Sequence, residues 1–312
     1  MTPIKTHRTV CSIFILLPLS FGASCSSPQS PAGDNSALYV AIHKADLAEV
    51  RTLLDRGANP NSTIVRQGIL ERFTRYNSKS PPAPLVVAIL EKQPEIVKVL
   101  LEKGAKVNFQ DAAGFTPLEH AMSDGNPDII GALLQSGADA KMESKFGFPL
   151  VFEAACRGKD EALKLLLSSG ADVNNSDSIG AAGQHYVGSL ESAYERLVGR
   201  SSPKTRPGAT LLMLAAQMGH TGVVKLLIDR GADLNARDSA GRTALMLVVE
   251  EGLGATTGKP MEISRLLLSS GADVSVRDNN GDSALMRAKK FAGFSVFHEE
   301  VVRMLQAAGA TD

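Results

Sequence analysis

Tryptophan is absent from the 312-residue chain, and aromatic residues of every kind make up only 5% of it. Because 44% of the residues are hydrophobic, a folded core has to be built from aliphatic side chains. Basic and acidic residues balance at 33 each, and a net charge of zero gives no support to a nucleic-acid partner. The six histidines have no paired spacing to cysteine, glutamate or one another, so neither a metal nor a cofactor is expected.

The N-terminal residues 1–24 have the layout of a secretory signal peptide. Lys5, His7 and Arg8 precede an uncharged apolar run that ends at Phe21 and is too short to span a bilayer comfortably. Small residues then follow. This order of charged, apolar and small residues predicts export, and a retained cytoplasmic tail is the alternative.

The segment that ends this leader, FGASC from Phe21 to Cys25, resembles a bacterial lipobox, although Gly22 stands where leucine is usual. The resemblance implies cleavage before Cys25 and acylation of that cysteine, and ordinary signal cleavage is the alternative. Two or three acyl chains would hold the protein stably at a membrane. Residues 25–35 are polar and contain serine and proline, and they predict a flexible tether after the lipidated cysteine.

Ser26 directly follows Cys25, and by resemblance to enterobacterial lipoproteins a residue other than aspartate implies the outer membrane. The expected location is the bacterial periplasm, lipid-anchored, with the outer membrane favoured over the inner. Removal of Cys11 and acylation of Cys25 would leave Cys156 alone, so no intramolecular disulfide is expected. Cys156 follows two alanines, and we expect a small packing residue there rather than a reactive thiol.

The most regular feature of the chain is a Gly-Ala pair followed by Asp, Asn or Lys. It recurs at Gly57, Gly104, Gly137, Gly170, Gly231 and Gly271, with a truncated form at Gly309. The intervals are 47, 33, 33, 61, 40 and 38 residues, so a 33-residue unit carries insertions of 14, 0, 0, 28, 7 and 5. This period predicts a repeat architecture, which points to binding rather than catalysis.

The clearest unit runs from Asp111 to Asp139. Thr116 is placed to cap a first helix, and Pro117 takes the first helical position, where its missing N–H costs nothing. A second helix has apolar residues at helical spacing, and the Gly-Ala pair suits a left-handed C-cap. The unit resembles the ankyrin repeat. The resemblance implies an all-α solenoid of about seven helix-turn-helix units with finger loops, in which each repeat touches only its neighbours.

The capping position of this unit recurs through the chain. It falls at Ser36, Ala83, Thr116, Pro149, Thr210, Thr243 and Ser283, several of which depart from the Thr-Pro of the family pattern. We therefore predict one continuous ankyrin-repeat domain over residues 36–312. Insertions are expected near 62–82, 175–209, 252–260 and 291–297, the first two in finger loops and the last two in helical segments.

Two short motifs suggest enzyme chemistry, but neither fits its structural context. The segment from Gly252 to Pro260 is similar to a phosphate loop, yet its spacing is wrong and Pro260 replaces the required Ser or Thr. Ser201 and Lys204 match the Ser-x-x-Lys spacing of acyl enzymes, but nearby prolines predict a loop instead of a helix. We expect no catalytic residues.

Basic and aromatic residues gather in the two finger insertions. The first holds Arg72, Phe73, Arg75 and Tyr76, and the second holds His185, Tyr186, Tyr194 and Arg196. Tyrosine and arginine dominate binding hot spots because they bury a large area and keep a polar group. We predict that these eight residues contact a partner, and the alternative for any one aromatic is that it pins its loop to the solenoid.

The favoured hypothesis is a monomeric, non-enzymatic interaction module of the bacterial envelope that binds a partner protein through the concave face and the finger insertions. Exported proteins of this type are similar to periplasmic binding or protective factors, including immunity proteins. One alternative is an enzyme whose site is built in the 175–209 insertion from His185, Tyr186 or Ser201. A second alternative is a purely structural scaffold.

Overall fold

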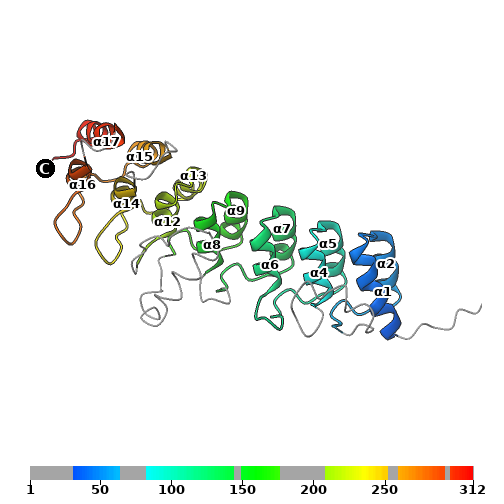
Figure 1. The fold of residues 1–312 in the computed structure, drawn as a ribbon. Helices are drawn as coiled ribbons and strands as arrows, with labels where there is room; N and C mark the ends of the chain where they lie inside the picture. Colours follow the sequence, from blue (N-terminus) through cyan, green and yellow to red (C-terminus); the bar gives the residue numbers. More distant parts are fainter. Residues whose placement is uncertain are drawn as a thin grey trace, which may run out of the picture.

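The computed structural model describes residues 31–63, 82–143, 149–175, 208–251, 259–291 and 296–311. Over these residues the chain forms seven pairs of helices that follow one another in a single curved row, and they contain no strand beyond two isolated bridges (Figure 1). Each pair is one repeat, numbered 1 to 7 from the N-terminus. The all-α solenoid of about seven helix-turn-helix units is confirmed.

The first helix of each pair is called inner and the second outer. The inner helices are α1 (Pro31–His43), α4 (Pro84–Leu90), α6 (Pro117–Asp124), α8 (Leu150–Arg157), α12 (Leu211–Gln217), α14 (Ala244–Glu251) and α16 (Ala284–Phe291). The outer helices are α2 (Leu47–Asp55), α5 (Pro94–Glu102), α7 (Pro127–Gln135), α9 (Asp160–Ser168), α13 (Thr221–Asp229), α15 (Lys259–Ser269) and α17 (Val296–Ala307).

Side-chain caps begin several inner helices. In repeat 3 the Glu119 N–H donates to the Thr116 hydroxyl at 3.3 Å, and the Thr116 N–H donates to the Glu119 carboxylate at 2.8 Å. Equivalent hydroxyl caps start repeats 5, 6 and 7 at Thr210, Thr243 and Ser283. Ala83 and Pro149 make no side-chain cap, so the helices that follow them depend on packing alone.

The Gly-Ala pair ends every outer helix. All seven of its glycines have φ between 80° and 95°, a left-handed conformation that a side chain makes costly. In repeat 1 the Ala58 N–H then donates to the Leu53 carbonyl at 3.0 Å, and the same bond recurs in the other repeats. The pair is therefore the C-cap that its sequence predicts.

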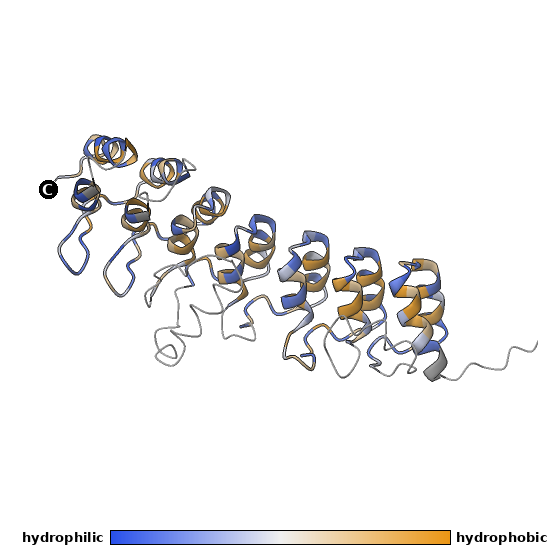
Figure 2. Ribbon diagram, viewed as in Figure 1, coloured by the Kyte–Doolittle hydropathy of each residue, from blue (hydrophilic) through white to orange (hydrophobic). Residues whose placement is uncertain are grey.

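The core is a continuous aliphatic layer between neighbouring helices. Figure 2 shows hydrophobic positions on the faces where helices meet and hydrophilic positions on the outward faces. In α5, for example, Ile96, Val97 and Leu100 are at most 3% exposed. Tyr39 of α1 is the largest fully buried side chain.

Neighbouring repeats are also joined by polar bonds at the turn between inner and outer helix. Gln93 and His220 donate to the carbonyls at the ends of α1 and α8, on Ile42 and Cys156, each at 2.8 Å. His298, which is fully buried, makes the equivalent contact to the carbonyl of Val249 at 3.1 Å. His220 therefore has a structural role in this turn.

An asparagine ladder runs along the loops that follow the outer helices. Its members are Asn61, Asn108, Asn174 and Asn235, and each amide oxygen accepts a backbone N–H from the next repeat at 2.7–3.2 Å. In repeats 3 and 6 the equivalent residues are Lys141 and Ser275, and among the described residues no such bond joins repeats 3 and 4 or repeats 6 and 7. The inner helices α6 and α8 at this junction also touch less extensively than the other neighbouring inner pairs.

The N-terminal boundary differs from the sequence prediction. Helix α1 begins at Pro31, so Ser36 lies inside it instead of capping it, and residues 31–35 are not part of a flexible tether. Asp34 and Asn35 are buried, Asp34 pairs with Arg56 at 3.3 Å, and Asn35 bonds to the loop after α2. These contacts extend the helix because buried polar groups need partners. Likewise Lys259 belongs to α15 and Val296 to α17, so the expected insertions 252–260 and 291–297 are shorter at those ends.

Candidate partner-binding surface

The face formed by the finger loops and inner helices, which we call the concave face, has three described finger tips with one common turn. Asp111, Asp238 and Asp278 begin these tips. In repeat 3 the Asp111 carboxylate accepts the N–H groups of Ala113 and Phe115 at 2.8 and 2.9 Å, and Gly114 turns the chain at φ 84°. The tip is held by its own aspartate and presents its backbone in one conformation.

The tips of repeats 6 and 7 are joined edge to edge. The Asn279 N–H donates to the Ala240 carbonyl at 2.9 Å, and the Asn279 side chain donates to the Ser239 carbonyl at 2.9 Å. Arg237 reaches across to the Arg277 carbonyl at 2.9 Å. These two fingers therefore form a single unit at the C-terminal end of the concave face.

A cluster of buried charges, which we call the C-terminal charge cluster, lies behind the joined fingers. Arg242 pairs with Asp238 at 2.8 Å and with Glu250 at 3.2 Å, while Arg287 pairs with both Glu250 and Asp278. The Asp278 side chain is fully buried. Burial, and then the charge of Arg242, lower the pKa of Arg287. Such a cluster is stable only while every member keeps its partners.

The C-terminal charge cluster also borders a hollow of about 510 Å³ between the fingers and α14 and α16. Arg242, Glu250 and Arg287 line it together with polar residues of the two finger tips. The Nε of Arg287 is buried and has no hydrogen-bond acceptor among the described residues. The hollow thus offers a partner charged groups of both signs.

Two more polar pairs continue the concave face in repeats 3 and 4. His120 contacts Asp111 at 2.8 Å, and Glu153 contacts Arg157 at 3.3 Å. Burial alone would raise the pKa of Asp111, but the bonds from His120 and the backbone outweigh it and lower that pKa. Burial raises the pKa of Glu153.

Cys156 belongs to the same helix as Glu153 and packs against the core. Burial, with a further contribution from the charge of Glu153, raises the pKa of its thiol to about 12. A thiol with so little thiolate at neutral pH is a poor nucleophile. The interpretation of Cys156 as a packing residue agrees with this environment.

Sequence reasoning missed the polar anchor at the base of the first insertion. The Tyr39 hydroxyl lies 2.7 Å from the Ser62 carbonyl and 2.8 Å from the Pro82 carbonyl, one on each side of residues 64–81. Asn35 donates to the Ser62 hydroxyl at 3.1 Å. Burial raises the pKa of Tyr39 well above its usual range, so the hydroxyl keeps its proton. Tyr39, the one tyrosine outside the two finger insertions, therefore holds the two ends of the first insertion.

The residues predicted to contact a partner lie outside the described residues. These are Arg72, Phe73, Arg75, Tyr76, His185, Tyr186, Tyr194 and Arg196. Cys25, Ser201 and Lys204 also lie outside them, as does most of the segment from Gly252 to Pro260. In the part of the chain that is described, no group of three metal-ligating side chains gathers, and no helix is long and apolar enough to cross a membrane.

Comparison with known proteins gives one consistent result. A family profile for ankyrin repeats (three copies) matches residues 64–144, 85–177 and 181–276. An ankyrin repeat protein of Rickettsia bellii is 33% identical over 91 residues, which cover 26% of this chain and 38% of that protein. Less than two thirds of that relative is therefore matched.

Two solved structures share the fold. An ankyrin repeat domain from Acinetobacter baumannii is 24% identical with a TM-score of 0.56, and the match covers 73% of this chain and 98% of that domain. The ankyrin repeat domain of Bcl-3, a member of the IkappaB family, is 23% identical with a TM-score of 0.59, over 85% and 97% of the two chains. With its seven helix pairs, its glycine C-caps and the profile match over more than half its length, this chain belongs to the ankyrin-repeat family.

Proposed function

We propose that this protein is a non-enzymatic interaction module that binds a partner protein through its concave face and its two long finger insertions. Ankyrin repeats are general protein–protein interaction modules. The described concave face adds a polar surface with defined finger tips and, at its C-terminal end, a charged hollow. Large clustered polar and aromatic groups on a rigid scaffold suit recognition of another protein.

The observation that carries the proposal is that the stack continues across both insertions. Asn61 bonds to repeat 2 beyond residues 64–81, and Asn174 bonds to repeat 5 beyond residues 176–207. The scaffold therefore does not need the inserted residues in order to stack. Chain that is added at finger loops without a stacking role is where repeat proteins gain binding residues.

The residues proposed to make the contact are the basic and aromatic ones of the two insertions. They are Arg72, Phe73, Arg75, Tyr76, His185, Tyr186, Tyr194 and Arg196. Tyr39 is not among them, because its hydroxyl is committed to the ends of the first insertion. We assign it a positioning role.

We further propose that the protein works in the bacterial envelope as a protective or immunity-type factor. The support is the leader of residues 1–24 and the lipobox-like segment that ends at Cys25, with the outer membrane favoured by Ser26. Helix α1 begins at Pro31, six residues after Cys25, so an acylated Cys25 lies at most about 22 Å from the start of the helix. A partner would then be bound close to the membrane surface.

The test of the binding site is recovery of a partner from envelope extract on the immobilised mature chain. A variant with Tyr76, Tyr186 and Tyr194 all changed to Ala should recover at least about tenfold less, since aromatic hot spots each contribute more than 1 kcal/mol. Lys225→Ala, on the outer helix of repeat 5, is the matched control and should recover the same amount. Equal recovery by the triple variant and the control would reject the site.

The test of location is mass spectrometry of the mature N-terminus together with cell fractionation. Lipidation predicts an acylated residue 25 in the membrane fraction and release of the Cys25→Ala variant from that fraction. An unmodified N-terminus at another residue, or an intact leader in the soluble fraction, would contradict the lipid anchor.

A further inference from the structure

The outer helices share a register in which one position departs from the rest. Each outer helix has a buried leucine near its C-terminal end, and the residue two positions before it is exposed or half-buried at the outer surface. In chain order this residue is Arg51, Lys98, Gly131, Lys164, Lys225, Arg265 and Arg303. Six repeats therefore carry a long basic side chain where repeat 3 has glycine.

The acid that belongs with this base is still present in repeat 3. In three other repeats a glutamate three residues before the base forms an ion pair with it on the same helix. These pairs are Glu95–Lys98 at 2.8 Å, Glu161–Lys164 at 3.3 Å and Glu300–Arg303 at 3.0 Å. The equivalent acid of repeat 3 is Asp128. No described base lies within ion-pair distance of the Asp128 carboxylate. The charge of Asp128 contributes to the raised pKa of Lys98, but the Lys98 ammonium donates its hydrogen bond to Glu95.

Gly131 has no structural reason to be glycine. It lies in the middle of α7 without a left-handed φ, and a Cβ added to it would meet nothing within 4 Å. Glycine is among the least favourable residues inside a helix, so the position keeps a residue that weakens the helix. What the absent side chain creates is space.

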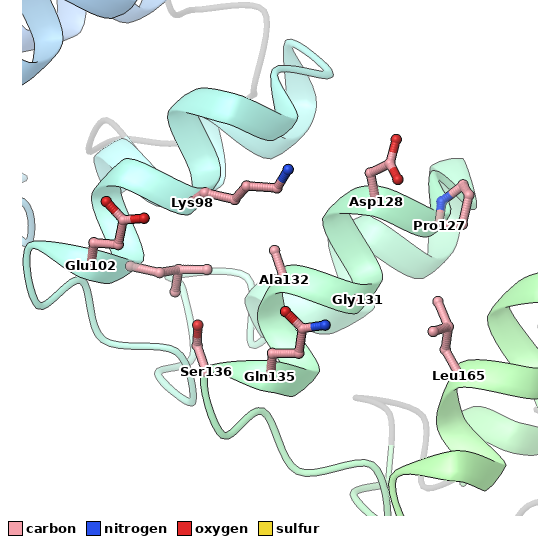
Figure 3. A pocket seen from close by; sticks show the side chains of 10 residues that line it. Lys98, Glu102, Pro127, Asp128, Gly131, Ala132, Gln135, Ser136 and Leu165 are labelled. Carbon is pink, nitrogen blue, oxygen red and sulfur yellow. The ribbon is translucent and has the colours of Figure 1, made fainter.

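We call the surface formed by the outer helices the convex face. The space at Gly131 is a groove of about 540 Å³ on this face, between α5, α7 and α9 (Figure 3). Gly131 and Ala132 form its floor, and half-buried Leu101 and Leu165 stand on its two sides. Asp128 lies at one end of the floor helix. Among the described residues Lys98 is the only base that lines the groove; of the two acids there, Glu102 pairs with Arg51 at 3.9 Å, which leaves Asp128.

We propose that this convex groove binds a lysine or arginine side chain of a partner protein. The aliphatic stem of that side chain lies over Gly131 and Ala132 between the two leucines, and its charged head pairs with Asp128. The partner thus supplies the base that the other repeats carry themselves. A long basic side chain fits because it combines an apolar stem with a charged tip, as the groove combines leucines with a carboxylate.

This convex site is independent of the concave face, because it lies on the outer helices of repeats 2 to 4 and uses none of the finger loops. The protein can therefore bind one partner at the concave face and, at the convex groove, a basic segment of the same partner or of another.

Selection of random displayed peptides on the full chain, with counter-selection on the Gly131→Lys variant, tests the proposal. Lysine at position 131 fills the groove with the chain's own base, and it is a better helix former than glycine, so the variant folds. The enriched peptides are expected to share one lysine or arginine with apolar neighbours. Enrichment of peptides without a common basic residue, or no enrichment over Gly131→Lys, would overturn the proposal.

An enriched peptide labelled with a fluorophore then gives affinities by anisotropy. Gly131→Lys should weaken it about tenfold or more and Asp128→Asn several-fold, because the first removes the space and the second the charge. Gly131→Ala adds only a methyl group and Glu161→Gln changes an equivalent acid that already has a base, so both should bind as the unchanged protein does. Equal affinity of all four variants, or loss with Glu161→Gln as with Asp128→Asn, would place the peptide elsewhere and refute the groove.

Discussion

At the N-terminal end of the stack, Tyr39 and Asn35 hold the loop after α2 with uncharged hydrogen bonds, whereas at the C-terminal end arginines hold the fingers with ion pairs. Both arrangements fix chain segments on the same concave face. They differ in the free-energy cost of losing them, because a buried carbonyl without a donor costs less than a buried charge without a counter-ion. The same scaffold therefore tolerates change unevenly along its length.

The largest expected effect comes from Arg287→Ala, which breaks the C-terminal charge cluster. The fully buried Asp278 loses its cation, so the free energy of unfolding in urea should fall by about 3–5 kcal/mol. The loss should shrink at acidic pH, where carboxylates are neutralised. Arg303→Ala, whose side chain is 69% exposed, is the control and should change stability by less than about 0.5 kcal/mol. Similar costs for the two substitutions would contradict the role of the cluster.

Tyr39→Phe tests the uncharged hydrogen bonds at the base of the first insertion. The substitution removes the single hydroxyl proton that the Ser62 and Pro82 carbonyls share, which should cost about 1–2 kcal/mol in the same urea titration. Because no charge is involved, the cost should be the same at acidic and neutral pH, unlike that of Arg287→Ala. Trypsin should also cut residues 64–81 faster in the variant. A cost that depends on pH as strongly as that of Arg287→Ala would remove the distinction between the two ends.

Lys141→Asn tests the junction between the two ends. Asparagine at this position should accept the Asp172 N–H and add a member to the asparagine ladder, which should raise the free energy of unfolding by about 0.5–1 kcal/mol. Lys141→Ala, which offers no acceptor, is the matched control. A gain with alanine equal to that with asparagine would show that removal of the lysine, and not a new bond, is responsible.

The smallest expected effect is that of Glu153→Gln in the middle of the concave face. Burial raises the folded pKa of Glu153, so the folded protein binds this proton more tightly than the unfolded chain does. Stability then falls as pH rises from the unfolded value of 4.5 through the raised folded value. Glutamine removes that loss, so the variant should be a few tenths of a kcal/mol more stable at pH 7, with the gain absent below about pH 4. A gain that persists in acid would point to another cause.

The sequence was sufficient to predict the repeat, its period, its glycine C-caps and its hydroxyl N-caps in repeats 3, 5, 6 and 7, because each depends on local chemistry. A glycine at positive φ and a threonine before a proline act within a few residues of themselves. Long-range pairings were out of reach. Nothing near Tyr39 in the chain indicates that its hydroxyl meets Ser62 and Pro82, and Arg287 finds Glu250 only after two repeats have stacked.

The candidate binding surfaces show the same difference between features that depend on local sequence and features that depend on the stacked fold. Departures from the period located both insertions, and their residues remain predictions. The concave finger tips of repeats 3, 6 and 7 follow from the aspartate and glycine of each. The convex groove depends on an absence, the missing base at Gly131, and it became visible only when the helices aligned the seven repeats in one register.

The gap in the asparagine ladder at Lys141 has a mechanical consequence. A linear stack carries a pulling force through each junction in series, so it yields first at the junction with the fewest cross-links. On the inner-helix side that junction lies between repeats 3 and 4, where the ladder bond is missing and α6 and α8 touch least, whereas α7 and α9 remain packed on the outer side. Under tension we expect the inner helices to separate first at this junction, before the repeats on either side of it unfold.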